Sequence, residues 1–232
     1  MHTIADRLDN LRERVRAAEI GCGREPGSVS ILAVSKTQPV EAIREAAAAG
    51  QRAFGENYLQ EAHEKIDALA GLGLEWHFIG PLQSNKTRAV AESFDMVHTI
   101  ERLKIARRLS GQRPDHLPPL ACCIQVNVSG EPSKSGVAPA DVPALAREVA
   151  ALPRLALRGL MALPAPEADP EAQRRPFARL RGLLEDLRGE GLSLDTLSMG
   201  MSADMEAAIA EGATVVRIGT ALFGPRRYPH GG

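Results

Sequence analysis

The feature that most constrains the fold is a regular alternation between short apolar runs and longer amphipathic or alanine-rich segments. Short apolar runs bounded by turn residues are typical of buried strands, and the segments between them have the periodicity of helices. Strands that alternate with helices predict a parallel sheet, and eight such units in 232 residues predict closure into a barrel. The predicted strands are residues 31–36, 52–55, 75–79, 96–100, 120–128, 157–162, 194–197 and 213–218.

The sequence therefore predicts an α/β protein with a single (β/α)8 TIM barrel. Each strand except the last is followed by a predicted helix, and only a short tail follows the last one. An open, doubly wound sheet is the structural alternative, although no G-x-G-x-x-G motif follows the first strand. No linker or break in composition divides the chain, so we expect one domain over residues 1–232. Its parts are an N-terminal helix at about 2–19, the barrel at about 30–224 and a short C-terminal tail.

Composition and charge argue against several classes of function. Apolar residues make up 44% of the chain, the net charge is −1 and no basic stripe is present, so we expect no nucleic-acid partner. No apolar run is long enough to span a bilayer, and the N-terminus lacks the apolar stretch of a signal peptide. The three cysteines lack metal-ligand spacing, and the adjacent Cys122 and Cys123 are poorly placed to form a disulfide. We expect a cytoplasmic protein without a metal or membrane partner.

Functional residues of such barrels lie at the carboxyl ends of the strands, and a lysine occupies the first of these positions. Lys36 ends the first predicted strand, so its amine would lie in the barrel mouth. Partial desolvation lowers the pKa of a lysine and makes its amine nucleophilic toward carbonyl groups. The alternative is a lysine that extends from a strand end to water, and position alone favours this alternative.

Two loops near the end of the chain have the composition of a phosphate site. Residues 198–202 follow the seventh strand and contain Gly200, Met201 and Ser202, whose backbone amides would precede a helix. An ordinary helix N-cap at Ser202 is the alternative. Residues 217–220 follow the eighth strand and place Arg217 beside a glycine. Phosphate binds at these two loops in many such barrels, and a lysine in the same mouth then favours an aldehyde-bearing phosphate such as pyridoxal 5′-phosphate (PLP).

Three further polar residues are candidates with ordinary structural alternatives. Asn57 follows the second strand and is equally well explained as a helix N-cap. His77 lies within the third strand, where a single histidine is usually a hydrogen-bonded core residue. Lys134 lies between serines in the loop after the fifth strand, and it either contacts an anion or belongs to a solvated surface loop.

Several long motifs occur in one order along the chain and carry a family resemblance. They are LAVSKT at 32–37, FGENY at 54–58, WHFIGPLQSNK at 76–86, SKSG at 133–136, RGLM at 158–161, SMGMSADM at 198–205 and VRIGTALFG at 216–224. By these motifs the chain resembles the PLP homeostasis protein family. The resemblance implies a barrel like the N-terminal domain of bacterial alanine racemase, with PLP held as a Schiff base on Lys36.

The same resemblance implies roles for the other candidate residues. Ser202, Gly219 and Thr220 are expected to hold the phosphate group, with backbone contributions near Gly200 and Met201. Arg217 is expected to face the pyridine nitrogen, and Asn57 to lie near the ring.

The function implied by the resemblance is to bind, buffer and deliver PLP, with apo PLP-dependent enzymes as acceptors and no turnover. A monomer is expected, and Lys134 is a candidate for a second, transient PLP acceptor. Two alternatives remain. The first is a weak amino-acid racemase, although racemases of this fold take a second base from a C-terminal β-domain that we do not expect in this chain. The second is a barrel that binds another phosphorylated metabolite and leaves Lys36 unmodified.

Overall fold

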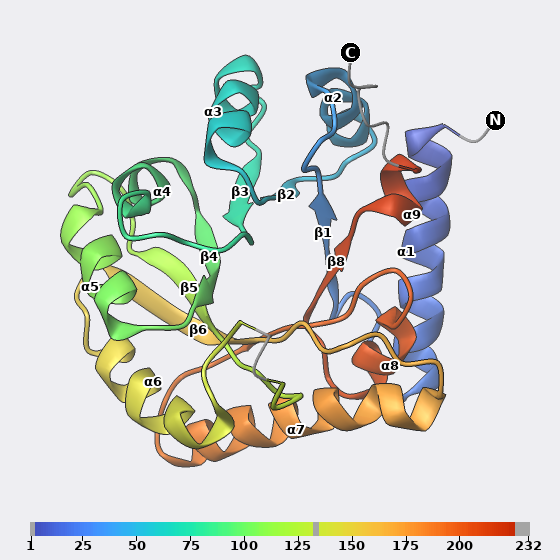
Figure 1. Ribbon diagram of the computed structural model, residues 1–232. Coiled ribbons are helices and arrows are strands. Elements are labelled where there is room, and N and C mark those ends of the chain that lie inside the picture. Colours follow the sequence, from blue (N-terminus) through green and yellow to red (C-terminus); the bar gives the residue numbers. More distant parts are fainter. Residues whose placement is uncertain (1–2, 132–134, 226–232) are drawn as a thin grey trace.

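The computed structural model describes residues 3–131 and 135–225, and these form a closed barrel of eight parallel strands in chain order (Figure 1). The strand β8 pairs with β1 and closes the barrel. The predicted (β/α)8 barrel is therefore confirmed, and the open sheet is excluded. The strands are β1 Ser30–Val34, β2 Ala53–Glu56, β3 Glu75–Phe78, β4 Met96–Ile100, β5 Leu120–Gln125, β6 Leu155–Met161, β7 Thr196–Ser198 and β8 Val215–Ile218.

Helices surround the barrel and cover the outer faces of its strands (Figure 1). They are α1 Ile4–Gly21, α2 Val40–Ala48, α3 Leu59–Ala68, α4 Thr87–Ser93, α5 Leu103–Gln112, α6 Val142–Ala150, α7 Pro170–Gly189, α8 Met205–Ala210 and α9 Thr220–Phe223, with a 3-10 turn at Pro139–Asp141. No described helix is both long enough and apolar enough to cross a membrane.

The N-terminal helix α1 starts at a capping box and lies alongside α8 and α9 (Figure 1). The Thr3 side chain accepts a hydrogen bond from the backbone N–H of Asp6, and the Asp6 carboxylate accepts one from Thr3. This exchange satisfies two amides that a helix start otherwise leaves without partners. Leu8, Leu11 and Val15 are buried, as their helical spacing predicts.

Burial on both faces of the strands explains why their sequences are almost continuously apolar. All five residues of β4 are buried, and the inward and outward faces of β5 are both covered. Parallel strands in a barrel contact side chains inside and helices outside, so alternation with polar residues is not required.

Most strand boundaries differ from the predicted ones by one or two residues. The first strand ends at Val34 and not at Lys36, so this lysine lies in the loop that follows β1. Two differences are larger. The last strand is followed by a short helix, α9, where only a tail was predicted. Its four residues form one helical turn directly after Gly219. The fifth strand ends at Gln125 and not at 128. Val126 instead makes an isolated bridge to Val137, because Gly136, with φ of 119°, turns the loop back onto the strand end.

Candidate functional site

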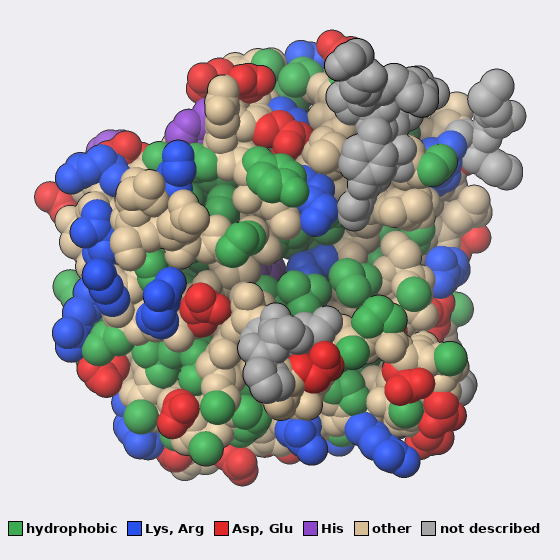
Figure 2. Space-filling model, in the orientation of Figure 1, with side chains coloured by type: hydrophobic (Ala, Val, Ile, Leu, Met, Phe, Trp, Pro, Cys, Tyr) green, Lys and Arg blue, Asp and Glu red, His purple; other side chains and the backbone are tan. Residues whose placement is uncertain are grey.

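A cavity of about 290 Å³ opens at the carboxyl ends of the strands, close to the lower end of the roughly 300–1,000 Å³ range of small-molecule sites. Figure 2 shows this face of the molecule hollowed near its middle, with Lys and Arg side chains beside the hollow. The cavity is lined by seven of the eight predicted site residues: Lys36, Asn57, Met201, Ser202, Arg217, Gly219 and Thr220.

Gly200, the eighth predicted residue, supports the site without lining the cavity. Its φ is +93°, and a Cβ added there would lie 2.5 Å from the Cβ of Ala208. Its carbonyl oxygen accepts a 2.9 Å hydrogen bond from the backbone N–H of Arg217. Gly200 therefore allows a tight turn to pack against α8 and joins that turn to β8.

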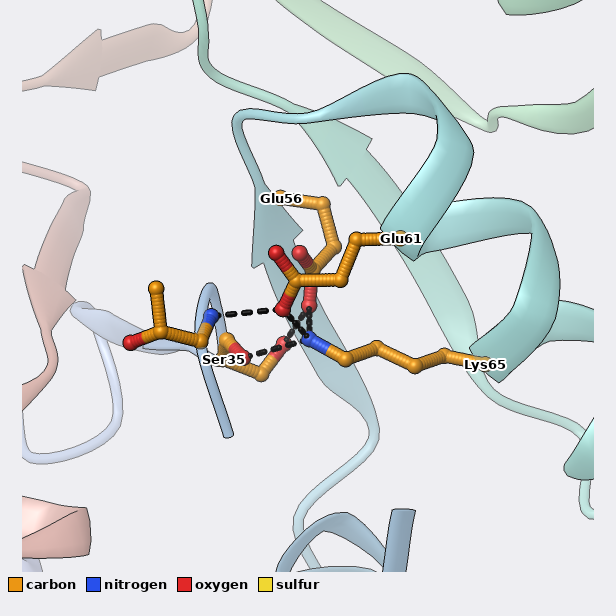
Figure 3. A network of polar contacts seen from close by, with 5 residues as sticks. Ser35, Glu56, Glu61 and Lys65 are labelled. Atoms are coloured by element: carbon orange, nitrogen blue, oxygen red, sulfur yellow. Dashed lines mark hydrogen bonds and ion pairs between the residues drawn. The ribbon is translucent and has the colours of Figure 1, made fainter. Parts of the chain in front are cut away.

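The loop that carries Lys36 is held by polar contacts on both sides of the lysine. Lys36 lies two residues beyond the end of β1 and is half-buried. The carbonyl oxygen of Ser35 accepts a 2.7 Å hydrogen bond from Nζ of Lys65, and the backbone N–H of Thr37 donates a 2.6 Å bond to Oε1 of Glu61. Lys65 and Glu61 also form an ion pair one helical turn apart on α3 (Figure 3).

Glu56 completes this group, which we call the Lys36 clamp (Ser35, Thr37, Glu56, Glu61 and Lys65). Its Oε1 accepts a 2.6 Å hydrogen bond from the Ser35 hydroxyl and a 2.7 Å bond from Lys65 (Figure 3). Its Oε2 is buried without a hydrogen-bond partner in the described structure. Burial, opposed by Lys65, raises the pKa of Glu56 above its ordinary value of 4.5.

The sequence reasoning missed the Lys36 clamp, although two signals for it were present. Glu56 is a charged residue directly after the second predicted strand, and a carboxylate that is buried there requires a partner. Glu61 and Lys65 have the i, i+4 spacing of a helical ion pair. Neither signal identifies the loop of Lys36 as the common partner, because that contact joins residues 24 to 30 positions apart.

Arg217 lies at the floor of the cavity, where its guanidinium group is held by three hydrogen bonds. Nη1 donates to the carbonyl oxygen and to the hydroxyl of Ser198 at 2.6 and 2.7 Å, and Nη2 donates to the carbonyl oxygen of Ala162 at 2.8 Å. Burial lowers the pKa of Arg217 to about 10, so the side chain remains a cation at neutral pH.

Asn57 contributes a side chain that is ready to contact a ligand. Its Oδ1 is buried and has no hydrogen-bond partner in the described structure. The N-cap of α3 is Tyr58, so the alternative explanation of Asn57 as a helix cap was wrong. A Cβ added to Gly80 would overlap the backbone of Asn57, so that glycine allows the two loops to lie in contact.

The turn before α8 is held by the side chain of Asp204 and not by Ser202, the alternative N-cap in the sequence analysis. The N-cap is Asp204, so Ser202 is not the helix cap, and it lines the cavity. The backbone N–H of Met201 donates a 2.6 Å hydrogen bond to Oδ1 of Asp204. The Met201 amide therefore already has a hydrogen-bond acceptor, whereas Ser202 and the first turn of α9 line the cavity.

The remaining sequence candidates are accounted for elsewhere. His77 is a hydrogen-bonded residue of the barrel interior, 3.0 Å from His98, as its structural alternative predicts. Lys134 lies outside the described residues. Among the residues that the structure describes, no group of three or more His, Cys, Asp or Glu side chains could hold a metal ion.

Comparison with known sequences finds one matching family model and several similar proteins. The model of the alanine racemase N-terminal domain matches residues 7–227. The pyridoxal phosphate homeostasis protein of Pseudomonas aeruginosa is 64% identical over 228 residues, which cover 98% of each chain. The protein of the same name from Escherichia coli K12 is 55% identical over 231 residues, which cover 98% of this chain and 99% of the relative.

Solved structures show the same barrel. PipY of Synechococcus elongatus, solved with PLP bound, is 40% identical and superposes with a TM-score of 0.85 over 96% of this chain and all of PipY. Alanine racemase of Corynebacterium glutamicum is 20% identical, with a TM-score of 0.68 over 97% of this chain and 63% of the racemase. At that identity the likeness to the racemase concerns the fold alone.

Proposed function

This chain belongs to the alanine racemase N-terminal domain family and, within it, to the PLP homeostasis proteins, and we propose that it buffers PLP and delivers it to other proteins. It is a PLP-binding protein, as the PLP-bound structure of its relative PipY indicates. The observation that carries the proposal is the meeting of Lys36, Arg217 and Ser202 around one cavity. An amine, a buried cation and a hydroxyl at a loop are the groups that an aldehyde-bearing phosphate requires.

The residues present fit the cofactor in chemistry as well as in size. The unpartnered Oδ1 of Asn57 is a buried acceptor that a ligand can satisfy, since burying a polar group without a partner is costly. Ser202, Gly219 and Thr220 would hold the phosphate, because a hydroxyl and the amides at a helix start suit an anion. Gly200 would act indirectly, through the turn that carries Ser202.

Lys36 is the residue that we propose to bind PLP covalently. Its amine would condense with the aldehyde carbon, forming a C=N bond and releasing water. The chain has five lysines, and among the described residues Lys36 is the lysine that lines the cavity. The contacts of the Lys36 clamp hold the backbone on both sides of this residue, which supports a role that needs a defined position.

Arg217 favours a carrier over an enzyme. The arginine side chain has only donors, so a ring nitrogen facing it would act as an acceptor and stay unprotonated. PLP stabilises carbanions most strongly when that nitrogen is protonated. A site with Arg217 in this place would therefore hold the cofactor while giving weak support to amino-acid chemistry.

The opening of the cavity also suits transfer to a partner. Leu163 and Met201 line the cavity and are each 38% exposed, so an acceptor could make apolar contact at the exit. We propose apo PLP-dependent enzymes as the acceptors, with the protein acting as a cytoplasmic monomer.

Transfer to an acceptor tests the delivery function directly. The full chain is loaded with PLP, freed of excess cofactor and mixed with an apo-aminotransferase, while a phosphatase destroys free PLP. We expect the acceptor to regain activity as the visible band of the loaded protein declines. Retention of the band together with an inactive acceptor would contradict delivery.

The racemase alternative is tested with the same loaded protein. An enzyme of this kind would exchange the α-proton of an amino acid with solvent deuterium, and Lys36→Ala would abolish the exchange. We expect no exchange above background across the common amino acids. Exchange that depends on Lys36 would replace the carrier function by an enzymatic one.

A further inference from the structure

A chain of polar side chains crosses the interior of the barrel, starting from the floor of the cavity. The Ser198 hydroxyl lies 2.7 Å from Nη1 of Arg217 and 2.7 Å from Nδ1 of His98. Nε2 of His98 lies 3.0 Å from Nδ1 of His77. Nε2 of His77 is 3.8 Å from a carboxylate oxygen of Glu75, the first residue of β3, which is exposed at the end of the barrel opposite the cavity.

The cavity end of this chain determines the direction of its hydrogen bonds. Arginine can only donate, so Ser198 accepts from Arg217. Ser198 is fully buried, and its single hydroxyl proton needs an acceptor. Among the residues that the structure describes, the remaining hydrogen-bond partner of that hydroxyl is Nδ1 of His98, so Ser198 donates to His98. His98 then carries its proton on Nε2 and donates it to Nδ1 of His77.

The opposite end of the chain agrees with this direction. With Nδ1 as an acceptor, His77 carries its proton on Nε2, which faces the Glu75 carboxylate. Interaction with His77 lowers the pKa of Glu75, which agrees with a proton between them. The reverse direction would place a nitrogen lone pair of His77 against the carboxylate and leave the Ser198 proton without an acceptor.

His98 stays neutral in this arrangement. It is completely buried, and burial, together with the neighbouring His77 and Arg217, keeps the pKa of His98 well below its ordinary value of 6.5. A neutral imidazole with one donor and one acceptor is what the chain requires at this position.

We propose that Ser198, His98 and His77 form a one-way hydrogen-bond chain that fixes the guanidinium group of Arg217 at the cavity floor. Ser198 and His98 are then positioning residues, because they act on a ligand through Arg217. The part of this inference that concerns the ligand rests on the proposed PLP-binding function, whereas the direction of the hydrogen bonds does not.

The direction is tested in the wild-type protein without cofactor. Nitrogen-15 NMR of the histidine side chains reports which ring nitrogen carries the proton. We expect His77 and His98 both to be protonated on Nε2 alone at neutral pH. Assignments use His77→Gln and His98→Gln. A proton on Nδ1 of either residue, or a doubly protonated His98, would overturn the proposal.

The effect on the cofactor is tested by titrating variants with PLP. Ser198→Ala and His98→Leu break the chain, and we expect PLP affinity to fall about tenfold, the loss expected for one buried hydrogen bond, with a shift of the visible maximum. His98→Gln retains one donor and one acceptor, so it should recover much of the affinity that His98→Leu loses. Circular dichroism confirms that each variant is folded.

The matched control is His116→Gln, because His116 is exposed and lies far from the cavity in the loop after α5. It should bind PLP as the wild type does. If Ser198→Ala and His98→Leu are folded and also bind PLP with wild-type affinity and spectrum, the positioning role is wrong. If the wild type itself takes up no PLP, the proposed function fails, and the NMR result alone decides the direction of the chain.

Discussion

Nζ of Lys65 lies 2.7 Å from the carbonyl oxygen of Ser35, the residue that immediately precedes Lys36. On the other side, Glu61, which pairs with Lys65, accepts a hydrogen bond from the backbone N–H of Thr37. Thr37 has a φ of +63°, an unfavourable value for a β-branched residue, so the surrounding contacts must hold the loop in this conformation. The position of Lys36 is thus tied to a buried ion network on α3.

The first prediction concerns Lys65→Met, which removes the cation of this network. The change leaves the buried Glu56 carboxylate, and the partly exposed Glu61 beside it, without a counter-charge, and breaking a buried pair such as Lys65–Glu56 costs about 3–5 kcal/mol. We expect the free energy of unfolding in urea to fall by this amount and the rate of PLP uptake to fall with it. Lys104→Met is the matched control, because Lys104 is exposed on α5. Unchanged stability and uptake in folded Lys65→Met would show that the clamp does not position Lys36.

The second prediction concerns the pH dependence of stability that Glu56 causes. Its pKa is raised in the folded protein, so the folded state binds more protons than the unfolded state above pH 4.5. The contribution of Glu56 to stability is therefore fully present below 4.5 and declines as pH rises through the raised pKa. Glu56→Gln does not titrate, so the difference in unfolding free energy between this variant and the wild type should change across that window. A difference that is constant with pH would contradict the raised pKa.

The third prediction uses two glycines with opposite surroundings. A methyl group at Gly80 would overlap the backbone of Asn57, whereas one at Gly111 would meet nothing within 4 Å. We expect Gly80→Ala to displace Asn57, lower the melting temperature and weaken PLP binding. Gly111→Ala lies in α5 and should stabilise the protein by about 0.5–1 kcal/mol with PLP binding unchanged. Equal PLP affinities in the two variants would argue against a role for Asn57 in the site.

The fold was predictable because its signals are local. The length of each apolar run, the helix between each pair of runs and the loop residues after each strand can all be recognised within about ten residues. The same local signals indicate which ends of the strands meet, so the sequence alone places Lys36, Arg217 and Ser202 in one mouth, where they line the same cavity.

The polar partners of those residues were not predictable in the same way. The contact between Lys65 and Ser35 spans 30 positions, and the contact between His98 and Ser198 spans 100. Each depends on the register of strands that are distant in sequence, and the residue types alone allow many pairings. The N-caps at Tyr58 and Asp204 differ from the predicted ones by only one or two positions, which is within the usual uncertainty of helix starts.

The most direct test of the account is to locate the covalent bond to PLP. The wild type and Lys36→Ala are incubated with PLP, reduced with borohydride and digested, and the mass of each of the five lysine-containing sites is measured. Reduction fixes the C=N bond as a stable amine. The account predicts a PLP adduct at Lys36 that the variant lacks. A wild-type protein in which Lys36 remains unmodified, with or without an adduct at another lysine, would contradict it.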